Sequence, residues 1–312
     1  MKAVICTAYG PPDVLKLQEI EKPVPKEFDL LIKVHASAVQ SGDRRVRALD
    51  VPAAGKFPMR IALGFKAPRK PVLGVVVAGE VVETGSRVQH FKVGDRVYGL
   101  TGMRFGGYAE YACIKEHKCV QLMPLNASFT EAASLPFGGT TALHFLRRVK
   151  IEQANTVLIY GASGAVGSMA VQIAKYYGAH VTGVCSGRNV ELVKSLGADA
   201  VIDYTKEGYD SELTTYDAVF DASGKINKQS ARQHLNEQGL FSTVAGQGVA
   251  TEFKEDLTLL NQMFEAGNLR AVIDSIYPME EIVAAHRYVD ADQKAGNVIV
   301  SVVHEEEQKI PV

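Results

Sequence analysis

The chain has 312 residues, of which 46% are hydrophobic and 22% are charged, and its formal net charge is −1. This length favours two domains over one, and the composition excludes a disordered chain. Because the charge is nearly balanced, no global field attracts nucleic acid or an anionic membrane, and we expect neither as a partner.

Four cysteines are scattered along the chain without a CxxC pair, at Cys6, Cys113, Cys119 and Cys185. This spacing argues against a disulfide framework and against a thiolate zinc site, and it fits a reducing compartment. The first residues carry an apolar run too short for a signal peptide, and Glu80 interrupts the apolar run that follows Leu73. We therefore expect a soluble cytoplasmic protein.

Residues 1 to about 125 contain short β patterns separated by Gly and Pro. Alternating or β-branched residues predict strands within 30–39, 73–85, 94–100 and 107–114. Between the first two lies a stretch, 44–71, that is rich in basic residues, Pro, Ala and Gly. We interpret it as a long loop, and loops of that length inside a domain are usually functional or mobile.

After residue 126 predicted strands alternate with predicted helices. The strand patterns cover 156–160, 180–185, 199–203, 216–223 and 240–246. The helical patterns begin at Ala165, at Asn189 and at Asn227, the last covering 227–239. Such alternation implies right-handed βαβ crossovers and a parallel sheet covered on both faces. From about residue 269 the chain adds strands around one helix.

A small-residue turn connects the first of these strands to its helix. The turn consists of Gly161, Ala162, Ser163, Gly164, Ala165, Val166 and Gly167. Relative to the dinucleotide-binding pattern GxGxxG, Ala162 replaces the first glycine, whereas Gly164 and Gly167 keep their places. Gly164 allows the backbone to approach a diphosphate, and the helix N-terminus offers N–H groups and a positive dipole end. We interpret the turn as a dinucleotide site.

The same frame of strand, turn and helix can also present a serine nucleophile. That use requires G-x-S-x-G, and here Ala165 stands in place of the last glycine after Ser163. No Asp and His pair follows at the expected strand ends. We therefore favour dinucleotide binding and retain Ser163 as nucleophile as the alternative.

The second predicted strand indicates which dinucleotide binds. An NAD-preferring site carries Asp or Glu there, but this strand is followed by Ser186 and Arg188, with no acid before Glu191. A hydroxyl and a guanidinium can hold a 2′-phosphate, so NADPH is favoured over NADH. Alternatively, Arg188 only caps or solvates a helix start. Later strand ends should line the cofactor cleft, with Ala222, Ser223, Ala245 and Gly246.

Several segments together resemble the medium-chain dehydrogenase/reductase superfamily over the full chain. These segments are GYAEYACI, ASLPFGGTTAL, VLIYGASGAVGSMAVQIAKYYGA, SLGADAVIDY, YDAVFDASG and GNVIVSVV. Within the superfamily, the chain is most similar to the zinc-free quinone oxidoreductase-like (NADPH:quinone reductase) branch. The resemblance implies an α/β protein with a GroES-like β-rich catalytic domain, 1–125 completed by 269–312, around a Rossmann domain with a doubly wound parallel sheet, 126–268. It also implies a cleft between the domains and a homodimer.

The resemblance also addresses metal binding. Alcohol dehydrogenases of the superfamily bind catalytic zinc at positions that match Gln40, Val75, Val76 and Phe137 here. Valine and phenylalanine have no ligand atom, so we expect no metal. Without zinc, the easier hydride acceptors delocalise the developing charge themselves. We therefore expect NADPH-dependent reduction of a quinone or of the activated C=C bond of an α,β-unsaturated carbonyl.

Matching positions supply the catalytic candidates. Gln40 offers an amide donor where quinone reductases commonly carry Asn, and Thr141 matches the threonine that approaches the nicotinamide. Asp43 matches the family aspartate, or it only ties down its loop. Arg45, where some relatives carry a tyrosine, can stabilise an enolate or a carboxylate, or it is simply solvated.

Two further residues complete the cofactor-binding candidates. Tyr204 is expected to stack near the adenosine phosphate, with a buried structural tyrosine as the alternative. Asn297, at the start of the last predicted strand, is included as well.

Three other interpretations remain open. The basic stretch 44–71 can attract an anionic substrate such as an acyl-CoA, or it can be solvated; nucleic-acid binding fits least, since few aromatic residues are interspersed. The acyl-CoA interpretation corresponds to an enoyl-thioester reductase. A non-catalytic NADPH-binding redox sensor is the third alternative, because no obligatory acid–base pair is apparent.

Overall fold

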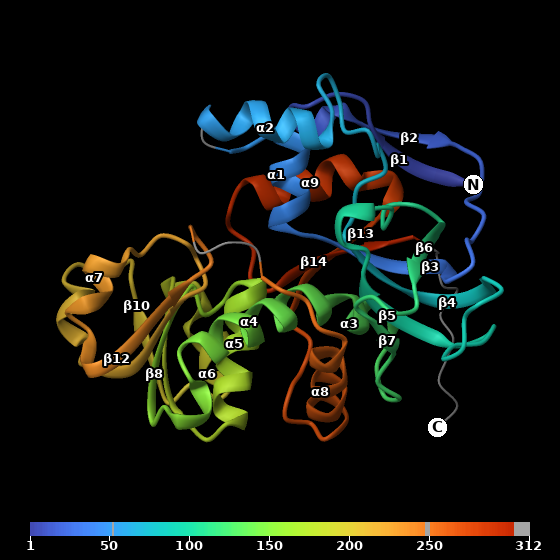
Figure 1. The fold of residues 1–312 in the computed structure, drawn as a ribbon. Helices are drawn as coiled ribbons and strands as arrows, with labels where there is room; N and C mark the ends of the chain where they lie inside the picture. The colour runs from blue at the N-terminus through green and yellow to red at the C-terminus, as the bar shows by residue number, and fades with distance from the viewer. Residues whose placement is uncertain (52, 247–249, 303–312) are drawn as a thin grey trace. The chain divides into compact units, whose positions relative to one another are not determined.

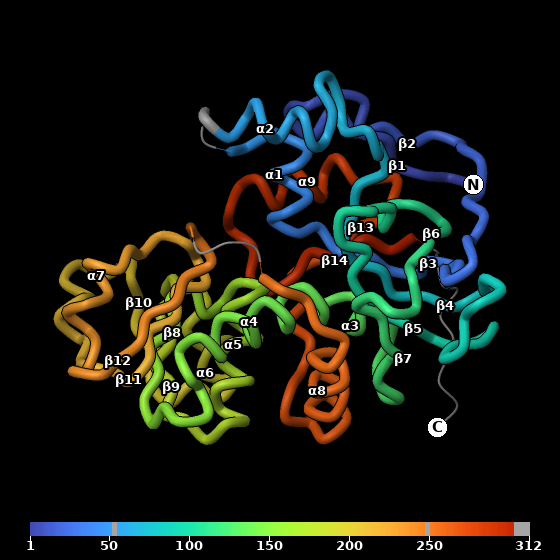
Figure 2. Tube along the Cα trace, viewed as in Figure 1, coloured from blue at the N-terminus to red at the C-terminus, as the bar shows by residue number. Residues whose placement is uncertain are grey.

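The computed structural model describes residues 1–51, 53–246 and 250–302, so residues 303–312 of the expected C-terminal segment lie outside the described residues. The chain forms two compact units (Figures 1 and 2). The first unit contains Met1–Met123, Ala127–Ser134 and the chain from Ile273 onward, and the second contains Pro124–Asn126 and Leu135–Val272.

The first unit is built on a seven-stranded sheet in the order β13-β14-β3-β4-β5-β7, with β6 also paired to β3. A separate hairpin joins β1 and β2. The strands are β1 (Lys2–Cys6), β2 (Leu15–Glu19), β3 (Asp29–Val39), β4 (Val76–Thr84), β5 (Arg96–Leu100), β6 (Tyr111–Lys115), β7 (Val120–Leu122), β13 (Ile273–Pro278) and β14 (Asn297–Ser301). Since β14 pairs with β3, the two ends of the chain share one sheet.

The helices of the first unit are α1 (Ser41–Ala48), α2 (Ala53–Leu63), α3 (Phe129–Ser134) and α9 (Ile282–Asp290). The first two occupy most of the stretch that the sequence predicted to be a loop, so that prediction was wrong. Pro and Gly were taken as breakers, yet Pro58 lies inside α2. A proline without an N–H is tolerated there, because Met59 and Leu63 on the same helix pack against the core.

The second unit is a parallel sheet of five strands in the order β10-β9-β8-β11-β12. Its strands are β8 (Thr156–Tyr160), β9 (His180–Cys185), β10 (Ala200–Asp203), β11 (Tyr216–Asp221) and β12 (Leu235–Thr243), and its helices are α4 (Pro136–Arg148), α5 (Ala165–Tyr176), α6 (Val190–Ser195), α7 (Lys228–Arg232) and α8 (Lys254–Glu265). The order reverses between β8 and β11, which is the switch point of a doubly wound sheet. The predicted fold class is confirmed.

One predicted helix in this unit is too long. The pattern predicted a helix over 227–239, but α7 ends at Arg232 and β12 begins at Leu235. The chain therefore returns to the sheet within three residues. Pairing of β12 with β11 outweighs the local helical preference of these polar residues.

Helix α4 packs closely against the first turn of α5 in the second unit. A Cβ atom on Gly138 would collide with the Ala165 carbonyl oxygen, and one on Gly139 would collide with Leu260 of α8. Glycine at both positions therefore allows α4 to approach its neighbours. This approach brings the helix that carries Thr141 next to the start of α5.

Candidate dinucleotide site

The turn after β8 is fixed by hydrogen bonds to the neighbouring strand. The N–H groups of Gly161 and Ala162 both donate to the Val184 carbonyl of β9, each at 3.0 Å, and Gly164 N–H donates to the Gly161 carbonyl at 3.0 Å. Helix α5 starts immediately afterwards, with Gly164 as its N-cap. The N–H groups of the first helical turn have no carbonyl partner within the helix, so they can donate hydrogen bonds to an anion.

The glycines of this turn are required for different reasons. Gly161 has a φ of 71°, which disfavours other residues. A Cβ atom on Gly167 would collide with the Gly161 carbonyl oxygen, so close packing of helix on strand requires glycine there. At Gly164, by contrast, the only described atom that a Cβ would meet is the Gly161 oxygen, at an ordinary 3.5 Å, and φ is −76°. Packing among the described residues therefore does not require glycine at this position, and the sequence pattern predicts that a diphosphate approaches the backbone here.

The partner of Ser163 distinguishes the two interpretations of the turn. The Asn189 side-chain amide donates to Ser163 Oγ at 3.0 Å and to Ser186 Oγ at 3.3 Å. An amide nitrogen cannot accept a proton, so it is not the base that a serine nucleophile requires. The geometry supports the dinucleotide interpretation. Asn189 was not among the predicted site residues.

The segment after β9 forms a short 3-10 turn over Gly187–Asn189. The Arg188 side chain is exposed and Ser186 is half-buried. Asp203, at the end of β10, accepts from the Thr205 backbone N–H at 3.0 Å and from its hydroxyl at 2.7 Å. These bonds from Thr205 lower the pKa of Asp203 below its ordinary value, as does the Gly187 N–H. Asp203 therefore holds the turn that carries Arg188.

Tyr204 follows directly on Asp203. Its backbone N–H donates to the Cys185 carbonyl at 3.1 Å, and its side chain is 51% exposed. The alternative of a buried structural tyrosine is therefore wrong. Because Cys185 ends β9, Tyr204 lies on the same edge of the sheet as Ser186.

A buried carboxylate organises the loop after β11. Asp221 is fully buried and accepts five hydrogen bonds, from the Ser223 backbone and hydroxyl, the backbone N–H groups of Gly224 and Ile226, and the Thr243 hydroxyl of β12. Asp221 was not among the predicted site residues. Its signal was an acid at the end of an apolar strand, directly before a small-residue loop.

The loops at this edge lie side by side. The glycines in these loops show how close the loops are. A Cβ atom placed on Gly161 would lie 3.0 Å from Ser223 Cβ, and one placed on Gly224 would lie 3.2 Å from Ala245 Cβ. Ala222 N–H donates to the Tyr160 carbonyl at 3.0 Å. The structure thus brings together the glycine turn and the predicted residues after β11 and β12. Gly246, with φ of 72°, ends the described part of the last loop.

In the first unit, Gln40 and Asp43 form the cap of α1. Gln40 N–H donates to Asp43 Oδ2 at 3.0 Å, and the Gln40 side chain accepts from the Asp43 N–H. Asp43 also accepts from Gly74 N–H at 3.2 Å and from the Tyr108 hydroxyl at 3.1 Å. Burial raises the pKa of Asp43 to about 6, although these hydrogen bonds oppose the shift. These contacts are those of a group that ties down backbone.

The Gln40 side chain also reaches the other end of the chain. Its Nε2 donates to Asn297 Oδ1 at 3.3 Å, and both residues are buried. Asn297, a predicted cofactor residue, therefore lies beside Gln40 at the start of β14. Arg45 is exposed on α1. Thr141 is half-buried on α4 of the second unit.

A second buried polar group joins α1 to α9. Arg47 Nη1 donates to His286 Nδ1 at 3.1 Å, and Nη2 donates to Asp290 Oδ2 at 2.6 Å. Burial, with the Arg47 charge, lowers the pKa of His286 to about 3. The imidazole is therefore neutral, and it packs edge-on against Tyr108, with ring centroids 5.6 Å apart.

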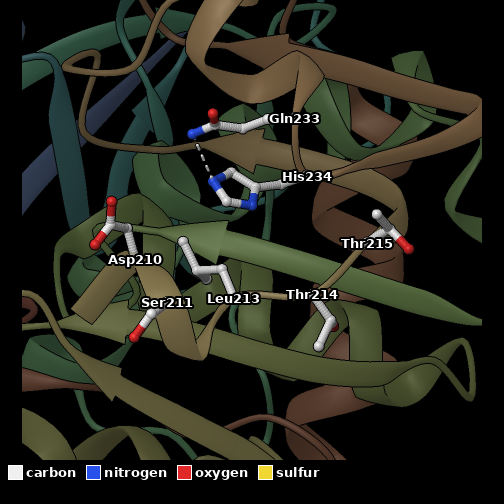
Figure 3. Close-up of a pocket in the computed structure, with 7 residues that line it drawn as sticks. All are labelled: Asp210, Ser211, Leu213, Thr214, Thr215, Gln233 and His234. Carbon is white, nitrogen blue, oxygen red and sulfur yellow. Dashed lines mark hydrogen bonds between the residues drawn. The ribbon is translucent and has the colours of Figure 1, made fainter. Parts of the chain in front are cut away.

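A cavity of about 560 Å³ opens at the opposite edge of the parallel sheet (Figure 3). Its lining comes from the segments that precede β11 and β12, namely Asp210, Ser211, Leu213, Thr214, Thr215, Gln233 and His234. Gln233 and His234 are hydrogen-bonded to each other at 3.1 Å. Since the glycine turn follows the carboxyl end of β8, this cavity is separate from the dinucleotide site.

The described residues contain neither a candidate metal site nor a candidate membrane-spanning helix. Within 1–51, 53–246 and 250–302, no group of three or more His, Cys, Asp and Glu residues can hold a metal ion. None of the helices in that part of the chain is long and apolar enough to cross a membrane.

A doubly wound nucleotide-binding sheet, together with a β-rich unit made from both chain ends, defines the architecture of a two-domain dehydrogenase. Comparison with known proteins agrees. Residues 26–124 match the alcohol dehydrogenase GroES-like domain, and residues 165–284 match the zinc-binding dehydrogenase family.

Full-length relatives are similar over nearly the whole chain. The 2-methylene-furan-3-one reductase of Solanum lycopersicum is 37% identical over 96% of this chain and 79% of its own length. The NADPH-dependent alkenal/one oxidoreductase of Arabidopsis thaliana is 36% identical over the same shares. Among solved structures, the quinone oxidoreductase from Coxiella burnetii has a TM-score of 0.85 at 31% identity, covering 97% of this chain and 99% of the other. The chain belongs to the medium-chain dehydrogenase/reductase superfamily, as its motifs predicted.

Proposed function

We propose that this protein is an NADPH-dependent reductase that transfers hydride to a quinone or to the activated C=C bond of an α,β-unsaturated carbonyl. The observation that carries the proposal is the turn at Gly164, where the only described atom within 4 Å of an added Cβ is the Gly161 oxygen, so that the described residues leave room for a diphosphate to approach the backbone. The names of the relatives, an alkenal/one oxidoreductase and a quinone oxidoreductase, support the acceptor class. When bound, the nicotinamide supplies the hydride.

The roles that we propose for the second unit follow its geometry. The first-turn amides of α5, from Ala165 to Gly167, bind the diphosphate. Ser163, Ser186 and Arg188 bind the adenosine phosphate, with Asn189 positioning the two serines. Asp221 positions the loop that carries Ser223, and Tyr204 offers an exposed ring for stacking. Thr141 approaches the nicotinamide from α4.

The first unit would supply the groups that act on the acceptor. A glutamine amide carries two hydrogens, and one from Gln40 is directed at Asn297, so the second is our candidate donor to the developing oxyanion. Asp43 is a positioning residue, since its oxygens already accept from backbone and Tyr108. Asn297 in turn orients Gln40. Arg45 is the candidate cation for an enolate or a carboxylate.

We also propose that the reaction is independent of zinc. The residues at the family's metal positions, Val75, Val76 and Phe137, offer no ligand atom. Activity should therefore be unchanged, within twofold, after prolonged dialysis against a chelator. Loss of activity that added zinc restores would contradict this proposal.

The test of the function is steady-state NADPH oxidation with three acceptors: a quinone, an enone and a crotonyl thioester. Turnover with the quinone or the enone supports the proposal. Turnover with the thioester alone would instead identify an enoyl-thioester reductase. Tight NADPH binding without any turnover would identify a redox sensor.

Assembly and location are proposed from the family resemblance and from the cysteine pattern. The family resemblance supports a homodimer, which analytical ultracentrifugation of the purified protein tests. The absence of a CxxC pair among the four cysteines supports a cytoplasmic location, which cell fractionation tests.

A further inference from the structure

Helix α2 carries apolar side chains on two opposite faces. Met59 and Leu63 pack against the core of the first unit. Phe57 and Ile61 each stand two positions earlier, about 200° around the helix, and they are 67% and 49% exposed. A surface helix normally carries polar residues on its outward face. Here the core does not explain the outward apolar residues.

The turn that follows α2 adds a third exposed apolar side chain. Phe65 is 55% exposed. Its carbonyl accepts from Arg60 Nη1 at 2.6 Å, and the Tyr9 hydroxyl donates to the neighbouring Gly64 carbonyl at 2.9 Å. Arg69 N–H donates to the Leu63 carbonyl at 2.6 Å. The turn is therefore held against the end of the helix, and no rearrangement is needed to expose Phe65.

The same segment is positively charged. Residues 51–79 contain five basic residues and no acidic residue; the basic residues are Lys56, Arg60, Lys66, Arg69 and Lys70. Removing these five from the 34 basic residues of the chain leaves 29 against 35 acidic ones. The segment is thus a local cationic region on a chain that is otherwise acidic. All but the half-buried Arg60 are exposed.

We propose that α2 and the turn after it form a docking surface for an anionic lipid membrane. In this arrangement Phe57, Ile61 and Phe65 enter the boundary between headgroups and acyl chains, and the four exposed basic side chains contact the lipid phosphates. The helix lies on the membrane and does not cross it. A polar polyanion would leave the three apolar side chains unused, whereas a lipid surface uses both features.

Charge also argues against the other obvious occupant, a second copy of the chain. A two-fold interface places the same patch on both partners. Two such patches would bring ten basic residues together without an acidic residue of 51–79 to compensate them. An anionic lipid surface provides the complementary charge.

This proposal goes beyond the proposed reductase function, and its test reads lipid binding and not turnover. Full-length protein is sedimented with vesicles of phosphatidylcholine, alone or with one third phosphatidylglycerol, at low and at high salt. We expect the protein to bind anionic vesicles at low salt. Binding to neutral vesicles, and binding to anionic vesicles at high salt, should each be at least tenfold weaker.

Two variants remove the two contributions separately. The variant F57S/I61S/F65S and the variant K56E/K66E should each bind anionic vesicles at least tenfold more weakly. Two matched controls alter exposed residues elsewhere. V24S/L125S removes side chains that are 81% and 89% exposed, and K16E/K118E reverses two exposed lysines. Both controls should bind within twofold of the wild-type protein.

Several results would overturn the proposal. They are equal binding to neutral and anionic vesicles, wild-type binding by F57S/I61S/F65S, and equal losses in the controls. If the wild-type protein does not bind vesicles and forms an oligomer that F57S/I61S/F65S does not form, the surface is instead an interface between copies of the chain. Thermal unfolding checks the fold, and the single variant I61S replaces any variant that unfolds early.

Discussion

A pair of alanine variants can distinguish the roles of Gly164 and Gly167, two glycines of the turn after β8. At Gly164 the Gly161 oxygen, at 3.5 Å, is the only atom of the described residues that the added Cβ would meet, and the backbone angles of −76° and 175° suit any residue. At Gly167 the added Cβ would lie 2.8 Å from Ala162 Cα and would collide with the Gly161 carbonyl. The first variant therefore probes the ligand, and the second probes the packing of the chain.

The expected magnitudes follow from these contacts. For Gly164→Ala, the lower entropy of the unfolded chain stabilises the protein by about 0.4–1 kcal/mol, and the poorer N-cap costs a similar amount. The free energy of unfolding should therefore change by less than about 1 kcal/mol. For Gly167→Ala, overlap with backbone that cannot move aside should lower it by about 1–3 kcal/mol or more.

Although Gly164→Ala should change stability little, it should weaken NADPH binding. A methyl group in the space left for the diphosphate should raise the Kd of NADPH at least tenfold, which corresponds to about 1.4 kcal/mol. The assays are urea unfolding of the cofactor-free protein and titration of NADPH fluorescence. The reasoning is refuted if Gly164→Ala binds NADPH as the wild-type protein does, or if it unfolds as early as Gly167→Ala.

Three further changes test other parts of the structure. Arg188→Ala should raise the Kd of NADPH at least tenfold and that of NADH less than twofold; equal losses would exclude the phosphate role. Asp221→Ala leaves five donors without their acceptor and should lower the free energy of unfolding by about 3 kcal/mol or more, with Asp221→Asn losing less. Because the pKa of Asp43 is raised from 3.8 to about 6, its contribution to stability is full below pH 3.8 and is lost as the pH rises through 6. The wild-type protein should therefore lose about 1 kcal/mol relative to Asp43→Asn between pH 5 and pH 7.5 in denaturant titrations, and a constant difference would contradict the raised pKa.

The sequence predicted the parts of the fold that local patterns encode. Strand and helix alternate in the second unit with the correct periodicities, and the turn at Gly161–Gly167 lies where a strand meets a helix. Helix α2 was missed because Pro58 and the surrounding Gly and Ala residues resemble a loop, and because packing of Met59 and Leu63 on the core stabilises the helix. Core contacts of this kind join residues far apart in the chain, so a local pattern does not reveal them.

The same reason accounts for the missed site residues. Asn189 bonds to Ser163, 26 positions away, and Asp221 bonds to Thr243, 22 positions away. These partners become neighbours only when the parallel strands are placed in order, because their carboxyl ends then share one edge. A sequence shows residue types at strand ends, whereas the pairing across the edge depends on the strand order.

The first unit shows how the two chain ends depend on each other. Gln40 at the start of α1 bonds to Asn297 of β14, and Arg47 at its end bonds to Asp290 of α9. Helix α1 is thus anchored at both ends to the C-terminal segment. His286 stays neutral at ordinary pH, because its pKa is lowered to about 3. Because His286 does not titrate in the range where Asp43 does, a pH-dependent change at the cap of α1 can be attributed to Asp43 and not to His286.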